Sequence, residues 1–320
     1  MKINRYAKWI SCVILAIKTN IYCNFVHVCC QKGRFIKTKN QMLNQNQIEF
    51  YQENGYLLLP NYASKQETSL LKSRMKDVLK GIQKDHESVF TTDEQTRTSD
   101  EFFLNSGDKV RCFFEDKLDE NGNRIINKIG HALHDLDEVY QSFSYQDKLL
   151  ALSKALNLRK AGIIQSQYIF KEPKVGGKVT AHTDSTFIYT DPLSCAGVWI
   201  ALEKASTENA CLWVLPKSHK FDLKERFVRN ETNDGTIFID LENDGVKWNL
   251  DELIPVEANE GDAVILHGSV VHLSYLNESN RSRHAYIMHL IDTEAAYPSN
   301  NWLQRADAPI QSIEKCIIER

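Results

Sequence analysis

The chain has 320 residues, of which 42% are hydrophobic, 25% charged and 10% aromatic, a composition typical of a globular protein. A chain of this length can bury a full core without disulfides or a structural metal. The formal net charge of −3 gives the whole molecule no electrostatic attraction to nucleic acid, so no nucleic-acid partner is expected.

The N-terminal segment differs in charge from the rest of the chain. Residues 1–48 carry eight basic residues and no acidic one, which leaves 31 basic against 42 acidic residues elsewhere, a net of −11. The apolar run WISCVILAI (9–17) is too short to span a bilayer, which takes about 20 helical residues. It fits a signal peptide, a transit peptide or a segment upstream of a start at Met42, and these three readings stay open. We therefore expect a basic extension over 1–41 and no membrane span.

The cysteines do not form a recognisable framework. Cys112, Cys195, Cys211 and Cys316 are spread through the body of the chain without CxxC spacing, so neither a zinc site nor a disulfide scaffold is indicated. Reduced thiols are typical of the cytoplasm, which is the location we expect for the body.

Helical patterns dominate the first half. Residues 42–54 read as a short helix ended by Gly55 and followed by an apolar strand. Ser64 with Glu67 three residues later forms a capping box for a helix that runs to about Gln83. The polar stretch 91–100 indicates a loop. Apolar and polar side chains alternate over residues 110–114, which predicts a strand, and a turn follows at Asn121–Gly122. Residues 135–156 have a helical pattern.

From residue 163 onward the pattern changes to short apolar runs separated by turns. These runs are IIQSQYIF, AGVWIAL, CLWVLP, TIFIDL, AVILHG and HAYIMHL. Such spacing is typical of an all-β sandwich or barrel. Because no linker-like composition separates the halves, we expect one domain over 42–320, with N-terminal helices packed on a β-barrel.

The candidate chemistry begins with an H-x-D pair, His182 and Asp184. In an extended segment, residues i and i+2 point to the same face, so an imidazole and a carboxylate can reach one cation. Such a pair occurs often by chance and is weak evidence alone. His267 and His272, which follow the apparent turn at Gly261–Asp262, are candidates for a third ligand.

An arginine completes the pattern. Two histidines and one carboxylate leave open coordination positions on one face, the arrangement of non-haem Fe(II) oxygenases. Arg283 lies eleven residues beyond His272, and an arginine can grip the far end of a dicarboxylate through two parallel hydrogen bonds.

Seven segments, in order, resemble the phytanoyl-CoA dioxygenase family over about residues 42–310. They are NKIGHALHDL (127–136), QSQYIFKEP (165–173), HTDSTFIYTDP (182–192), GVWIALE (197–203), ENACLWVLPKSH (208–219), HGSVVHLS (267–274) and RSRHAYIMHL (281–290). The resemblance implies an α+β, mostly β fold, with a double-stranded β-helix (jelly-roll, cupin-like) barrel and helices from the N-terminal half packed on it.

The resemblance also implies a metal site. His182, Asp184 and His272 match the family's iron ligands, whereas His267 matches a preceding strand position and reads as a packed histidine. Arg283 matches the arginine that holds the 5-carboxylate of 2-oxoglutarate, and no catalytic residue beyond the metal site is implied. Arg281 reads as structural or solvated.

Further positions match the family's co-substrate pocket. Ser274, Lys128 and Trp199 match residues that bind or line it, and Gln167 stands where relatives commonly carry methionine. Ala210 and Lys217 stand where the family pattern has glycine. Because a glycine at a turn usually supplies a positive φ, we expect backbone strain at Lys217.

The resemblance therefore implies an Fe(II)- and 2-oxoglutarate-dependent dioxygenase that uses O2, with ascorbate as an additive in assays in vitro. It would hydroxylate a small organic substrate, with an acyl-CoA as one candidate, and release succinate and CO2. The alternatives are an inert jelly-roll binding module and a zinc hydrolase, since two histidines and a carboxylate also suit zinc. No specific protein partner is inferred.

Overall fold

Antiparallel β-sheets make up most of the described chain. The structure, a computed structural model, describes residues 42–82, 88–90, 100–243 and 246–319, and Met42–Arg320 form one compact unit. The strands are β1 (Tyr56–Leu59), β2 (Val110–Leu118), β3 (Arg124–His131), β4 (Ala161–Ile169), β5 (Val179–His182), β6 (Ala196–Ala201), β7 (Leu212–Val214), β8 (Glu225–Arg229), β9 (Thr236–Asp240), β10 (Ile254–Val256), β11 (Ala263–His267), β12 (His272–Ser274) and β13 (Ala285–Asp292).

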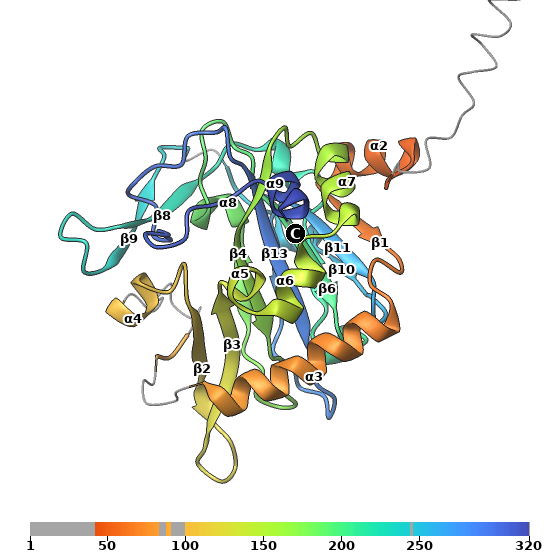
Figure 1. Cartoon of the computed structure of the whole chain (residues 1–320), viewed down its shortest axis with the longest axis vertical. Coiled ribbons are helices and arrows are strands. Elements are labelled where there is room, and N and C mark those ends of the chain that lie inside the picture. The colour runs from red at the N-terminus through yellow and green to blue at the C-terminus, as the bar shows by residue number, and fades with distance from the viewer. Residues whose placement is uncertain (1–41, 83–87, 91–99, 244–245, 320) are drawn as a thin grey trace, which may run out of the picture. The chain divides into compact units, whose positions relative to one another are not determined.

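These strands form two larger sheets and a separate hairpin. The seven-stranded sheet has the order β1-β11-β6-β13-β4-β3-β2, the four-stranded sheet has the order β10-β7-β12-β5, and β8 pairs with β9 (Figure 1). Side chains from both larger sheets, including Trp199, Leu212 and Ile287, share one buried cluster. The predicted jelly-roll fold is confirmed, with its core between the sheets.

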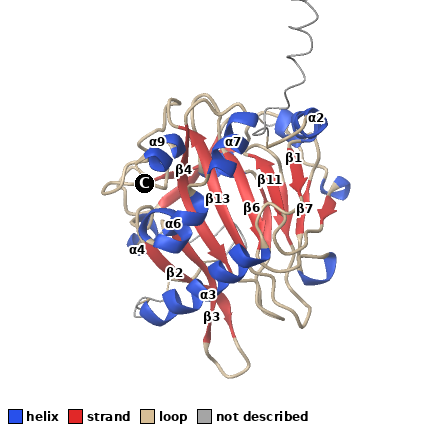
Figure 2. Ribbon diagram, turned by 45° about the vertical axis from the view of Figure 1, so that its right-hand side comes forward, coloured by secondary structure: helices blue, strands red, loops and turns tan. Residues whose placement is uncertain are grey.

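The helices are α2 (Gln45–Asn54), α3 (Lys65–Gly81), α4 (Glu101–Leu104), α5 (Leu133–Leu136), α6 (Glu138–Ser144), α7 (Asp147–Ala155), α8 (Asp184–Phe187) and α9 (Ile313–Ile318). Figure 2 shows α3, α6 and α7 across one face of the seven-stranded sheet. Leu71 of α3 and Leu152 of α7 belong to the same buried cluster as Tyr286 and Met288 of β13.

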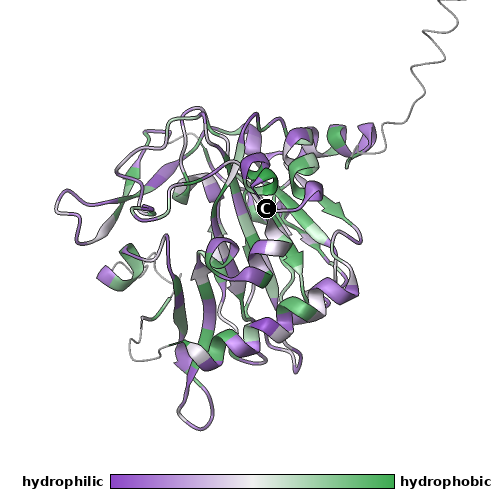
Figure 3. Ribbon diagram, viewed as in Figure 1, coloured by the Kyte–Doolittle hydropathy of each residue, from purple (hydrophilic) through white to green (hydrophobic). Residues whose placement is uncertain are grey.

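Side chains alternate along β13 because successive residues of a strand point to opposite faces. Tyr286, Met288 and Leu290 pack with the helices, whereas Ala285 and Ile287 pack between the sheets. The large sheet is therefore buried on both faces, which explains the continuous apolar runs in the sequence. In Figure 3 the most hydrophilic ribbon includes the tip of the β2–β3 hairpin.

The predicted end of the first helix and the predicted start of the second are confirmed, whereas α2 begins at Gln45 and not at Met42. Gly55 ends α2 with φ 77°, in the left-handed region that favours glycine. Ser64 accepts from the amide of Glu67, whose side chain accepts from the Ser64 amide, so the capping box begins α3. The helix ends at Gly81; residue 83 and most of the predicted loop, 91–99, lie outside the described residues.

The helical stretch predicted over 135–156 is divided into α5, α6 and α7. The first break falls at Asp137, whose carboxylate accepts hydrogen bonds from the amides of Val139 (3.1 Å) and Tyr140 (3.2 Å) and so begins α6. The second falls at Tyr145 and Gln146, between α6 and α7. Asp137 competes with helix continuation because an aspartate favours the N-cap position. The prediction of one stretch was therefore wrong in continuity, although the helical character is confirmed.

All six apolar runs of the second half form strands, and the hairpin turn at Asn121–Gly122 joins β2 and β3. Five strands were not predicted. Three of these, β5, β10 and β12, have three or four residues each, too few to show an alternating pattern, and the other two are β3 and β8.

The positive φ expected at Lys217 is confirmed, and Ala210 has one as well. Ala210 has φ 67° and Lys217 has φ 69°, in a region that residues with a Cβ rarely adopt.

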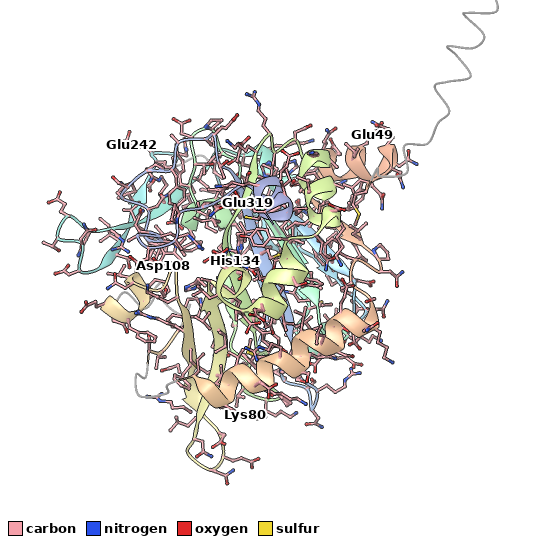
Figure 4. All side chains as sticks on the ribbon, viewed as in Figure 1. Glu49, Lys80, Asp108, His134, Glu242 and Glu319 are labelled. Atoms are coloured by element: carbon pink, nitrogen blue, oxygen red, sulfur yellow. The ribbon has the colours of Figure 1, made fainter. Side chains whose placement is uncertain are left out.

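Charged side chains such as those of Glu49, Lys80 and Glu242 lie at the periphery (Figure 4). Every helix within the described ranges is too short or too polar to cross the hydrocarbon core of a membrane.

Candidate active site

The three predicted metal ligands lie together between the sheets. His182 is the last residue of β5, Asp184 is the first residue of α8, and His272, the first residue of β12, pairs directly with His182. Their potential ligand atoms all lie within 4.8 Å of one another. The Nε2 atoms of His182 and His272 lie 3.8 and 3.7 Å from Asp184 Oδ1.

The H-x-D pair spans a junction between elements rather than one strand. Thr183, between the two ligands, has extended φ and ψ of −115° and 143°, so the side chains on either side point the same way. Helix α8 then begins at Asp184. Residues of and just after this helix, Phe187 and Ile188, line the same cavity as the two ligands.

Both histidines are oriented by main-chain carbonyls. His182 Nδ1 lies 2.8 Å from the carbonyl oxygen of Thr180, and His272 Nδ1 lies 3.1 Å from that of Val270. Because a carbonyl oxygen only accepts, each Nδ1 must carry the proton and donate it. The lone pair is then on Nε2, the atom that faces Asp184, as metal ligation requires.

Asp184 is held as a carboxylate. Burial alone would raise its pKa, but a hydrogen bond from His289 and the positive charge of His289, His272 and His182, when these imidazoles are protonated in the absence of a metal, lower the pKa below its usual value. Its Oδ2 is buried and has no hydrogen-bond partner. A Cβ on Gly197 would lie 3.0 Å from this oxygen, so glycine provides the room for the carboxylate.

This donor set fits Fe(II). Two neutral imidazole nitrogens and one carboxylate oxygen converge on one side of a cavity, and the partnerless Oδ2 of Asp184 shows that protein hydrogen bonds do not saturate the carboxylate. His182, Asp184 and His272 would hold the metal.

Arg283 lies at another part of the same cavity. Its side chain is buried, its Nε donates to the Ala210 carbonyl (3.1 Å), and its Nη1 has no partner. Burial lowers its pKa to about 10, so it remains a cation at neutral pH. Its Cζ lies 5.3 Å from the Trp199 ring centroid. A buried guanidinium with an open N–H suits a carboxylate ligand.

The structure brings the eight predicted site residues to one cavity of about 150 Å³, and their roles stay predictions. They are Lys128, Gln167, His182, Asp184, Trp199, His272, Ser274 and Arg283. Within that cavity, Lys128 Nζ lies 3.3 Å from the centroid of the Phe90 ring.

His267 and Arg281, which the sequence did not assign to the site, do not line this cavity. The Nδ1 of His267 accepts from the Ser269 amide (3.1 Å), and its ring packs on His219. Burial lowers the His267 pKa to about 4. Arg281 is exposed and pairs with Glu208.

Sequence reasoning missed His289. Its Nε2 lies 3.4 Å from Asp184 Oδ1, and its Nδ1 lies 3.1 Å from Gln165 Nε2 on the neighbouring strand β4. Alternation along β13 puts His289 on the same face as Arg283, six residues before it. This alternation can be seen in the sequence. It shows which face of the strand His289 is on, but it does not show that Asp184 lies opposite.

Lys171 was missed as well. It is buried, and its Nζ donates to Ser274 Oγ (2.9 Å) and to the carbonyl of Gly177. Burial, and after it the charge of Arg283, lowers its pKa well below the usual value. A lysine two residues beyond β4 looks like a surface residue in the sequence. Its burial is set by the segment around Gly177, which folds back over it.

Fold and site together define a class of protein. A jelly roll that carries two histidines and a carboxylate on its inner face, with a buried arginine in the same cavity, has the architecture of the non-haem Fe(II)- and 2-oxoglutarate-dependent oxygenases. The chain is an enzyme of this class.

The comparisons with known proteins give the family. The model for phytanoyl-CoA dioxygenase (PhyH) matches residues 51–285. The chain belongs to the phytanoyl-CoA dioxygenase family.

Similar relatives come from distant organisms. The chain is 37% identical to the phytanoyl-CoA dioxygenase of Arabidopsis thaliana, over 83% of this chain and 95% of that protein. It is 39% identical to the phytanoyl-CoA dioxygenase domain-containing protein 1 homolog of Dictyostelium discoideum, over 82% of this chain and 97% of that one.

Solved structures share the fold at lower identity. The non-heme alpha ketoglutarate dependent carbocyclase SnoK, from nogalamycin biosynthesis, matches with a TM-score of 0.59 at 20% identity, over 84% of this chain and 97% of that one. EctD from S. alaskensis, solved with 2-oxoglutarate and 5-hydroxyectoine, matches with a TM-score of 0.58 at 15% identity, over 85% and 87%.

Proposed function

We propose that this enzyme hydroxylates a small organic molecule at a C–H bond. The reaction consumes the substrate, O2 and 2-oxoglutarate and yields the hydroxylated product, succinate and CO2, so that one oxygen atom enters each organic product. The observation that carries the proposal is the presence of the His182–Asp184–His272 cluster and the open Nη1 of Arg283 in one cavity.

The bound iron would supply the activation of O2, and the chain's residues would do the rest. Arg283 would bind the 5-carboxylate of 2-oxoglutarate through parallel N–H donors, and Ser274 would donate to the same carboxylate. The buried walls around Trp199 would exclude water from the site, which strengthens these charge interactions.

The relatives' name refers to a phytanoyl-CoA substrate, and an acyl-CoA is one candidate for this chain too. We also propose a cytoplasmic location for the body. The four cysteines within the described residues are free, and Cys112, Cys195 and Cys211 among them are buried, which supports a reducing compartment. Imaging the full chain with a C-terminal fluorescent tag tests the location.

The experiment for the proposed function is succinate release by the full chain supplied with Fe(II), ascorbate, 2-oxoglutarate and O2. We expect succinate from the wild type and none above background from His272→Ala, which loses a ligand. Equal succinate from both proteins would contradict the proposal. Zinc added in place of Fe(II) should give none, because zinc has no redox chemistry.

A further inference from the structure

The side chain of Gln165 lies beside the metal cluster, at a distance from Arg283. Gln165 of β4 pairs with His289 of β13, which pairs in turn with Gly197 of β6. Figure 2 shows these three strands side by side. Four residues of strand, about 14 Å, separate His289 from Ala285, and Arg283 lies beyond Ala285. A co-substrate whose carboxylate is held by Arg283 therefore lies on the Arg283 side of the metal cluster, away from Gln165.

Hydrogen bonds on the metal side determine how the Gln165 amide is oriented. The Nε2 of His289 lies 3.4 Å from Asp184 Oδ1. A carboxylate oxygen only accepts, so this ring nitrogen carries the proton, and in a neutral imidazole the other nitrogen, Nδ1, is then an acceptor. This Nδ1 lies 3.1 Å from Gln165 Nε2. Only the NH2 group of the amide can donate to it, so the amide oxygen points away from His289.

The amide oxygen of Gln165 is left without a partner. Oε1 is buried and accepts no hydrogen bond from any residue that the structure describes. The side chain lines the cavity that also contains the metal cluster and Arg283. Because a buried acceptor that stays unpaired costs free energy, a ligand in the cavity that donates a hydrogen bond to this oxygen is favoured.

Unpartnered buried atoms coincide with the expected ligand positions of this cavity. Among the described residues that line it, four side chains have such an atom, namely Asp184 Oδ2, Arg283 Nη1, Gln165 Oε1 and Trp302 Nε1. Asp184 belongs to the metal cluster, and Arg283 is assigned to 2-oxoglutarate. The substrate is the organic ligand that these two residues do not account for, so Gln165 and Trp302 are left for it.

We propose that Gln165 is a specificity-determining residue that accepts a hydrogen bond from the substrate. The substrate class is then a molecule with a hydroxyl or N–H group close to the carbon that is hydroxylated, because Gln165 lies beside the metal cluster. An ether, ester or carboxylate oxygen has no proton to donate and would leave Oε1 unpaired. A charged group elsewhere on the substrate is compatible with this contact. The inference rests on the proposed function, since it names the substrate class of the same site.

The test compares two probes in the full chain with Fe(II) and 2-oxoglutarate in the absence of O2, where the visible absorption of the metal complex reports binding beside it. Benzyl alcohol and benzyl methyl ether share a ring and an oxygen, but only the alcohol can donate a hydrogen bond. The additional methyl group gives the ether more apolar surface to bury, so burial alone favours the ether. We expect the alcohol to bind at least about tenfold more tightly.

Two substitutions separate the acceptor oxygen from the size of the side chain. Gln165→Met removes the acceptor at similar length, and it should weaken alcohol binding about tenfold while leaving ether binding little changed. Gln165→Glu keeps an acceptor oxygen and should keep the preference for the alcohol. Gln52→Met, at an exposed glutamine of α2, is the matched control and should bind both probes like the wild type. The absorption of each variant before the probe is added checks that the metal complex still forms, and the two probes in the wild type decide if it does not.

The outcomes separate this inference from the proposed function. If the metal complex forms but the ether binds as tightly as the alcohol, or neither probe binds, Gln165 does not select a donor and the oxygenase assignment stands. Equal affinities are also the result expected if a buried water pairs with the amide oxygen. Wild-type alcohol binding in a Gln165→Met variant that forms the metal complex would overturn the role of Gln165 too. If the metal complex does not form in the wild type, the proposed function fails and the inference fails with it.

Discussion

Lys171 Nζ lies 2.9 Å from Ser274 Oγ, and both side chains are buried at the end of the cavity that contains Arg283. Because Lys171 Nζ donates in this hydrogen bond, it takes a lone pair of the hydroxyl and leaves the Ser274 proton free to point into the cavity. Lys171 thus orients a residue that is predicted to bind 2-oxoglutarate.

Lys171→Met should therefore weaken 2-oxoglutarate binding. We expect the apparent KM for 2-oxoglutarate to rise about tenfold while kcat falls much less, since the lost bond involves the co-substrate and not the metal. Steady-state kinetics with varied 2-oxoglutarate measures both. Lys174→Met, at an exposed lysine three residues away, is the control. A fall in kcat with an unchanged KM would contradict this role.

Arg283→Lys should also weaken 2-oxoglutarate binding, by about 10- to 100-fold, because lysine cannot offer two parallel donors to one carboxylate. Arg281→Lys is a matched control two residues away, at an exposed side chain that pairs with Glu208. Anaerobic titration of 2-oxoglutarate into the Fe(II)-loaded proteins gives the affinities. Equal affinities in the two variants would rule out the assigned role of Arg283.

Gly197→Ala should lower the affinity for Fe(II). The new methyl group would lie 3.0 Å from Asp184 Oδ2, and the carboxylate would have to move. We expect a loss of about tenfold or more in metal affinity with little change in the melting temperature. Gly81→Ala is the control, since a Cβ there meets nothing within 4 Å. Unchanged metal affinity in Gly197→Ala would show that the close packing is not required.

His289→Phe tests the contact with Asp184 Oδ1. Groups that hold a ligating carboxylate in place commonly contribute 10- to 100-fold to metal affinity or activity, and we expect a loss in that range. Fe(II) titration under anaerobic conditions measures it, and circular dichroism checks that the fold is kept. A variant that binds Fe(II) like the wild type would show that His289 only packs against the site.

Acid should destabilise the fold partly through Glu67. Its partial burial raises the pKa, but Lys148 and the amide and hydroxyl of Ser64 outweigh this and lower the pKa from 4.5 to about 2. A lowered folded-state pKa stabilises the protein above pH 4.5, and this contribution is lost as the pH falls from 4.5 toward 2. Urea unfolding at a series of pH values should show that the free energy of unfolding falls less steeply toward acid in Glu67→Gln than in the wild type. If the free energy of unfolding depended on pH equally in both proteins, Glu67 would not contribute to acid sensitivity.

Much of the fold could be predicted from local patterns. The capping box at Ser64 and the left-handed residue at Gly55 mark helix ends through contacts within a few residues, and the apolar runs mark strands. The continuous helix predicted over 135–156 was wrong because the chain breaks twice, at the Asp137 cap and again at Tyr145 and Gln146 between α6 and α7.

The site could be predicted only in part. His182 and Asp184 are two residues apart, so their shared direction follows from the extended backbone at Thr183. His289 contacts Asp184 only because β13 pairs with β4 and β6 in one register, which the sequence does not specify. The burial of Lys171 likewise depends on contacts with Ser274, 103 residues away.

His182, Asp184 and His272 are proposed to hold Fe(II) in a cavity where Arg283 binds 2-oxoglutarate. The most direct measurement is the visible absorption of the full chain with Fe(II) and 2-oxoglutarate in the absence of O2. We predict a new visible band that requires both additions and is lost in Asp184→Ala, whose fold is checked by circular dichroism. A wild-type protein without this band at saturating concentrations, or an Asp184→Ala variant with an undiminished band, would contradict the claim.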